Sequence, residues 1–184
     1  FDWADYNKHL IQTHCSKELI LAFDPSYLSK AGKSTPHVGK YWSGTAKAVK
    51  HGIEIGSLAV VDIANRTAMS LEAVQTPNIS DSDTDENLID HYSKVIMNNL
   101  SVIQSLGIKH LAVDAFFTKY RFVHSITNNA QLDVIGRMRN DANLRYPFNG
   151  KQKPGRGRKR KYGDKVNVER IDRRRIQFCF TEGG

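Results

Sequence analysis

The sequence predicts a mixed α/β fold, with helices packed on a five-stranded sheet. Two short apolar runs, at residues 19–24 and 108–114, each end in an aspartate. A wholly apolar run bounded by turn residues is typical of a strand buried on both faces. Between these runs lie a hairpin pattern and a long amphipathic stretch. Together they indicate antiparallel strands followed by a helical crossover.

The N-terminal part of the chain is expected to contain a short helix at residues 4–15 and the strand at 19–24. Residues 25–52 are rich in Lys, Gly, Ser and Thr, so we expect a long loop. A loop of that length within a domain is usually functional. Its cationic side chains indicate a phosphate-rich partner nearby, and they are Lys30, Lys33, Lys40 and Lys47.

The middle of the chain predicts a hairpin and then a helix. Residues 53–63 and 67–75 are strand-like around a turn at 64–66, and Asp62 is interpreted as a turn residue. An acidic loop at 77–86 leads into the helix, with Asp83 as the cap and Glu86 in capping-box spacing. An amphipathic stripe continues to Leu106, and Gly107 ends the helix.

The remaining elements complete the sheet. A strand runs to Asp114, residues 116–126 are expected to be helical, and residues 131–139 form the fifth strand. Residues 147–150 mark a boundary. The domains are therefore predicted as a core at 1–148, in which residues 1–17 could instead be the end of a preceding segment, and a basic region at 149–184.

This order of elements is the RNase H-like arrangement. Its first and fourth strands are central neighbours, so Asp24 and Asp114 should face each other. Two adjacent carboxylates repel unless one is protonated or a cation lies between them, and Mg²⁺ or Mn²⁺ prefers carboxylate oxygen. Both residues are therefore predicted metal ligands and catalytic residues for phosphodiester cleavage. The alternative, that each is only a strand-end turn residue, stays open.

The net charge of +8 is concentrated at the C-terminal end. Residues 1–148 balance 15 basic against 15 acidic residues, whereas residues 149–184 hold 12 basic and 4 acidic ones. Glycine and proline interrupt the basic run, so we expect a solvated, flexible segment. Such a segment favours contact with nucleic-acid phosphate. The predicted contacts are Lys151, Lys153, Arg156, Arg158, Lys159, Arg160 and Lys161.

Two further features bear on cellular location. No apolar run approaches the roughly 20 residues that a membrane-spanning helix needs, and no signal peptide is visible. The two cysteines, Cys15 and Cys179, have no metal-ligand spacing and do not indicate a disulfide framework. A reducing cytoplasm is the expected compartment.

Three stretches resemble the DDE transposases of bacterial insertion sequences. ILAFDPS at 20–26 with SKAGK at 29–33 is similar to the first-Asp motif, HGIEIGSLAVVD at 51–62 to the following strand, and LAVDAFFTK at 111–119 to the second-Asp motif. The resemblance covers roughly residues 18–165.

The resemblance implies metal-dependent cleavage and strand transfer at transposon ends in the bacterial nucleoid, by a homodimer on DNA. It implies two Mg²⁺ or Mn²⁺ ions in the complete site, held by Asp24, Asp114 and a glutamate in a Tyr…Arg…Glu motif. That motif does not occur before Gly184, so the third acid is expected beyond it, and residues 149–184 would begin the family's insertion subdomain. Further DNA contacts are expected from Lys30, Lys33, Lys119 and Arg121.

A second class of function fits the same sequence. A non-catalytic DNA-binding module could act through residues 149–184 alone, with neither aspartate involved. Its binding would depend steeply on salt and only slightly on base sequence.

Overall fold

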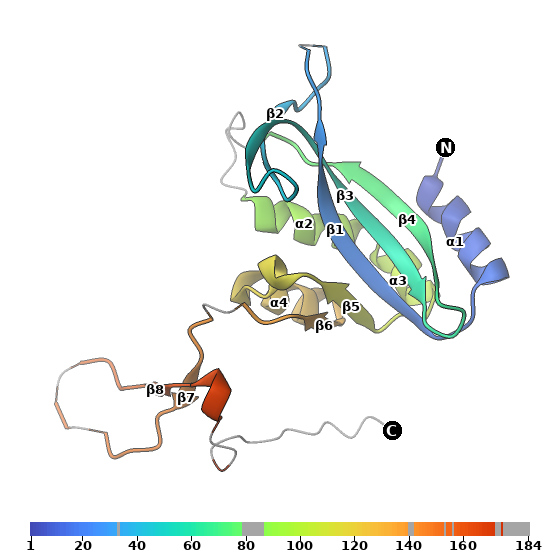
Figure 1. The fold of residues 1–184 in the computed structure, drawn as a ribbon. Helices are drawn as coiled ribbons and strands as arrows, with labels where there is room; N and C mark the ends of the chain where they lie inside the picture. Colours follow the sequence, from blue (N-terminus) through green and yellow to red (C-terminus); the bar gives the residue numbers. More distant parts are fainter. Residues whose placement is uncertain are drawn as a thin grey trace. The chain divides into compact units, whose positions relative to one another are not determined.

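A computed structural model describes residues 1–32, 34–78, 87–139, 142–152, 154–155, 157–171 and 174. The chain divides into two units, residues 1–139 and residues 140–184, and each is described by itself (Figure 1).

The described part of the first unit forms a six-stranded mixed sheet. β3 pairs with β1, β1 with β5 and β5 with β6, while β2 and β4 both pair with β3. β1, β5 and β6 are parallel, and β3 is antiparallel to its neighbours. This is the predicted RNase H-like order with one added strand. The strands are β1 (Leu19–Ser29), β2 (Gly39–Ser43), β3 (Ala48–Asp62), β4 (Thr67–Gln75), β5 (His110–Val113) and β6 (Asp133–Gly136).

The prediction of a long loop at 25–52 is wrong. β1 continues to Ser29, β2 occupies the middle of the segment, and β3 begins at Ala48. In β2 the inward positions are Gly39, Tyr41 and Ser43, and none of them is an aliphatic residue. The alternation that normally marks a half-buried strand is therefore hidden by the composition.

The N-terminal helix lies beside the hairpin of β3 and β4. α1 (Trp3–His14) is capped by Asp2 and lies along β4, where the Asn7 side chain donates to the Leu71 carbonyl at 2.9 Å (Figure 1). This confirms the short N-terminal helix. The hairpin of β3 and β4 is also confirmed, with a bulge between Leu58 and Ala59.

The predicted long helix is two helices, α2 (Leu88–Asn98) and α3 (Leu100–Ser105). Its cap is Asn87, whose side chain accepts from the Asp90 amide, and not Asp83. Asp83 and Glu86 themselves lie outside the described residues. The break falls at Asn99, whose side-chain amide donates to the Val95 carbonyl and to Glu72. A side chain that bonds its own preceding turn competes with helix continuation.

Aromatic side chains form the centre of the core. Phe23 of β1 packs against Tyr92 of α2 and against Phe117, with ring centroids 5.6 Å apart in both pairs. Phe117 belongs to a 3-10 turn (Ala115–Phe117), which is followed by α4 (Tyr120–Ser125) and a π-helical turn (Ile126–Ala130). The single helix predicted at 116–126 is thus three short elements, and the predicted strand at 131–139 is only β6.

Asp62 is buried at the end of β3. Its carboxylate accepts from the amide and hydroxyl of Ser16, both at 2.6 Å, and from the amide and side chain of Asn65. The hydrogen bonds from Ser16, followed by those from Asn65, hold the pKa of Asp62 well below its usual range. The interpretation of Asp62 as a turn residue is confirmed, and it also joins the start of β1 to the hairpin.

In the second unit a basic loop connects two short antiparallel strands, β7 (Arg145–Pro147) and β8 (Tyr162–Lys165), followed by a 3-10 turn (Val168–Arg170). Cys179 lies outside the described residues. Among the helices of the described residues, none is both long and apolar enough to cross a membrane.

Candidate functional site

Asp24 and Asp114 lie at the same level of two neighbouring strands. β1 and β5 run parallel, with Leu21 opposite Leu111 and Ala22 opposite Ala112. Two residues further along each chain come the two aspartates. The structure therefore brings together the carboxylates that the sequence predicts to be adjacent.

The local sequence explains why both carboxylates reach solvent. Phe23 is 2% exposed and anchors β1 in the core, whereas the next residue, Asp24, is exposed on the other face. Asp114 follows the last residue of β5 and caps the 3-10 turn, because its Oδ1 accepts from the Phe116 amide at 2.8 Å. That hydrogen bond fixes the orientation of one carboxylate of the pair.

The two carboxylates interact electrostatically. Partial burial of the Asp24 side chain raises its pKa, although the residue reaches solvent, and the negative charges of Asp114 and Glu54 raise it further. A raised pKa means that the charged form of Asp24 is disfavoured where it stands. A cation at this position would remove that penalty, so the pair has the electrostatics expected of a metal-binding site.

Glu54 is not among the site residues that the sequence predicts. It lies in β3 on the core face, 7% exposed, where its Oε1 accepts from the Tyr92 hydroxyl at 2.5 Å. Burial and the neighbouring Glu54 raise the pKa of Tyr92, so the phenol remains a neutral donor. The available signal was alternation, since Glu54 stands between the inward-facing Gly52 and Gly56.

The donors at the pair fit a hard divalent cation. Carboxylate oxygens are the ligands that Mg²⁺ and Mn²⁺ prefer, and Asp24 and Asp114 would supply them. Within the described ranges, no three His, Cys, Asp or Glu side chains form a group that could hold a metal ion. The described residues thus offer two acids at this position.

The predicted basic contacts of the first unit have different surroundings. Lys30 is exposed just beyond β1, and the Lys119 ammonium lies 3.8 Å from the centroid of the Phe116 ring. Arg121 is paired with Asp90 at 2.6 Å. Lys33 lies outside the described residues.

The basic loop of the second unit is held in shape by one glutamine. The side chain of Gln152 donates to the Arg160 carbonyl at 2.7 Å and accepts from the Arg160 amide at 3.0 Å. The Arg160 side chain in turn donates to the Tyr162 carbonyl and stacks on Phe148. Arg160 therefore has a structural role that the sequence did not predict.

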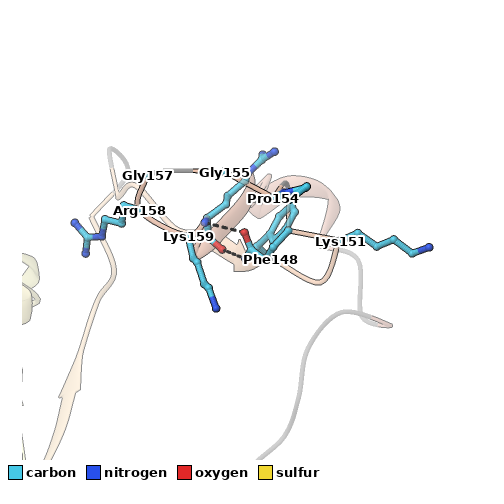
Figure 2. A pocket seen from close by; sticks show the side chains of 9 residues that line it. Phe148, Lys151, Pro154, Gly155, Gly157, Arg158 and Lys159 are labelled. Atoms are coloured by element: carbon cyan, nitrogen blue, oxygen red, sulfur yellow. Dashed lines mark hydrogen bonds between the residues drawn. The ribbon is translucent and has the colours of Figure 1, made fainter.

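The other cations in the described part of this loop face solvent. Figure 2 shows the side chains of Lys151, Arg158 and Lys159 extending outward from a shallow hollow bordered by Phe148, and Lys161 is also exposed. Lys153 and Arg156 lie outside the described residues. The described part of the loop has the local charge expected of a phosphate-contacting segment.

The fold and the acid pair define an RNase H-like α/β domain with a candidate metal site. No protein-family model matches the sequence, and no curated protein matches it. The chain is similar to crystal structures of Ciona intestinalis Endonuclease V in complex with a 24mer DNA containing an inosine followed by a ribo-adenosine, at 12% identity and a TM-score of 0.37, covering 73% of this chain and 55% of that one. A variant of that endonuclease with a 23mer matches at 14% identity, with the same TM-score and 54% of its chain covered. This chain spans about half the length of those structures, and the fold assignment rests on strand order and direction.

Proposed function

We propose that this chain carries part of the active site of a metal-dependent nuclease of the DDE transposase type, acting on DNA. The observation that carries the proposal is the alignment of Asp24 and Asp114 on adjacent parallel strands. The motifs around both residues support the transposase class. In this proposal the substrate is DNA at transposon ends, joined to target DNA by a homodimer, and a third acid completes a two-ion site.

The residues of this chain would act by holding and orienting charge. Asp24 and Asp114 would bind the cation, which when bound activates water and stabilises the leaving oxygen in phosphodiester cleavage. The Phe116 amide keeps the Asp114 carboxylate oriented. Lys119 lies five residues beyond Asp114 and places a positive charge near this end of β5, where it would meet the DNA backbone.

A Mn²⁺ titration tests the metal site. The wild-type chain should melt at higher temperature as Mn²⁺ is added, because a ligand that binds only the folded state stabilises it, by about 2.7 kcal/mol at 100 times the Kd. Asp24→Asn and Asp114→Asn should each abolish the increase. Glu18→Gln is the matched control, since Glu18 is an exposed acid just before β1 and should keep the full shift. Undiminished stabilisation in both aspartate variants would refute the proposed site.

The second candidate is a DNA-binding module without catalysis. The exposed cations of the loop between β7 and β8 favour it. In that case, replacing Lys151, Arg158 and Lys159 by glutamine should abolish DNA binding, and the salt slope should fall by roughly one for each lost phosphate contact. The two aspartate variants should bind DNA as tightly as the wild type. Neither they nor the wild type should cleave DNA when metal is added.

A further inference from the structure

A large aromatic side chain is exposed on the hairpin formed by β2 and β3. Trp42 is 60% exposed, and its cross-strand partner Val49 is 58% exposed. Tryptophan is usually well buried, and a paired exposed apolar surface on a strand ribbon indicates a binding surface.

The surroundings of this pair are wholly cationic. Residues 25–53 contain five lysines and no aspartate or glutamate. Lys40 pairs with His51 two positions along the ladder from Trp42 and Val49, on the same face, whereas Lys50 pairs with Tyr41 and belongs to the opposite face. Lys40, Lys47 and Lys50 are exposed, and none of them has an ion-pair partner among the described residues. The complementary partner is therefore a polyanion.

The same face of the sheet carries the acid pair. Asp24 is opposite Ser57 in the β1–β3 ladder, and Val49 and Ser57 are an even number of residues apart on β3. Side chains alternate between faces, so Trp42, Val49 and Asp24 belong to one face. The eight steps from Val49 to Ser57 span roughly 26 Å.

We propose that the β2–β3 hairpin binds single-stranded nucleic acid, with Trp42 stacked on an unpaired base and Lys40 and Lys47 against the phosphates. Aromatic rings bind any base through its π-face, and neighbouring lysines supply the affinity for the backbone. The hairpin would hold the strand that leads to Asp24 and Asp114. The inference rests on the proposed DNA partner and assigns its binding to the β2–β3 hairpin.

Fluorescence tests the inference directly, because the chain has two tryptophans, Trp3 and Trp42. In the full-length Trp3→Phe variant, Trp42 is the remaining reporter. Addition of an oligothymidylate of about 12 nucleotides should quench its emission, and a duplex of equal length should quench it less. Unchanged emission at an oligonucleotide concentration that saturates binding would overturn the proposal.

Affinity measurements separate stacking from hairpin stability. Trp42→Ala should raise the Kd for the oligonucleotide roughly 5- to 150-fold with the salt slope unchanged, whereas Trp42→Phe should keep most of the affinity. Lys40→Gln should reduce the salt slope by about one. Val49→Ala is the matched control, because it removes the cross-strand partner and keeps the ring. If Val49→Ala weakens binding as much as Trp42→Ala, the ring acts through the hairpin and the proposal is wrong.

The outcomes also distinguish this inference from the proposed metal site. Asp24→Asn and Asp114→Asn should lose stabilisation by Mn²⁺ yet keep the oligonucleotide-dependent quenching. Quenching without any effect of Mn²⁺ on the wild type would uphold the hairpin and refute the metal site. Stabilisation by Mn²⁺ without oligonucleotide binding would do the opposite.

Discussion

Asp24 and Asp114 stand side by side on two parallel strands, each two residues beyond the paired alanines Ala22 and Ala112. Neither carboxylate is neutralised by an ion pair within the described residues, and each adds to the negative potential at the other. Such an arrangement destabilises the folded protein when no cation is bound, and a bound cation would remove that cost.

Asp24→Asn should therefore stabilise the protein when no metal is present. Because the pKa of Asp24 is raised above its ordinary value of 3.8, its favourable contribution is complete only below that value and is lost as pH rises through the raised pKa. Around pH 7 the charge opposes folding, and removing it should gain on the order of 0.5 kcal/mol, the scale of a solvent-screened charge pair.

Thermal melting in a chelating buffer measures this gain. The difference between variant and wild type should shrink as the pH is lowered below about 4. A variant that melts at the wild-type temperature around neutral pH would show that repulsion between the two carboxylates does not destabilise the protein.

Tyr92→Phe should destabilise the core through Glu54. The Tyr92 hydroxyl donates to this buried carboxylate, and removing the donor leaves a buried acceptor unsatisfied. The expected loss is about 1–3 kcal/mol in the free energy of unfolding. Urea denaturation measures it, and in a Glu54→Leu background the same tyrosine substitution should cost less. Equal costs in both backgrounds would mean that the two side chains are not coupled.

Asp62→Asn should lower the stability of the protein at neutral pH and reduce the amount of stability that is lost in acid. Four hydrogen bonds favour the charged form of Asp62, so its pKa is lowered. A lowered pKa contributes stability above the ordinary value, and this is lost as pH falls below about 4. The variant should be less stable than wild type around neutral pH and approach it in acid. A pH-independent difference in the urea midpoint would contradict this account.

Gln152→Ala should loosen the loop between β7 and β8 without changing its charge. Both side-chain hydrogen bonds to the Arg160 backbone would be lost, at about 0.5–1.5 kcal/mol each. Amide hydrogen exchange at Arg160 should accelerate at least several-fold. Lys161→Gln is the control, since it removes a charge from the same loop and should leave that amide protected. Unchanged exchange in Gln152→Ala would show that the loop is held by other contacts.

The central architecture could be predicted because the first half of β1 and most of β5 are apolar. The runs that end at Asp24 and Asp114 are recognisable without any tertiary information, and their parallel pairing follows from the helical crossover between them. Strand β2 was not predicted, for the opposite reason. In β2 the inward positions include Gly39 and Ser43, so the strand forms through pairing with β3 and not through an apolar face of its own.

The site was predicted only in part for a related reason. A carboxylate at a strand end is visible in the sequence, but the burial of Glu54 depends on a partner 38 residues away, Tyr92. The exposure of Trp42 could not be predicted from the sequence either, because a tryptophan is ordinarily expected to be well buried. Both depend on contacts, or on their lack, between distant parts of the described chain.

The ladder between β1 and β3 has eleven paired positions, from Leu19 to Ser29, whereas β1 and β5 share two. Asp24 is therefore clamped in the middle of the longest ladder, while Asp114 follows a four-residue strand and enters a turn. The backbone at Asp24 is therefore held by strand pairing, whereas the backbone at Asp114 lies beyond the last pair of β5. Cations of different radius would be accommodated by shifts of the turn after β5, which would carry the Asp114 carboxylate and its hydrogen bond from the Phe116 amide together, and natural variation in the spacing of the two aspartates should accumulate in that turn.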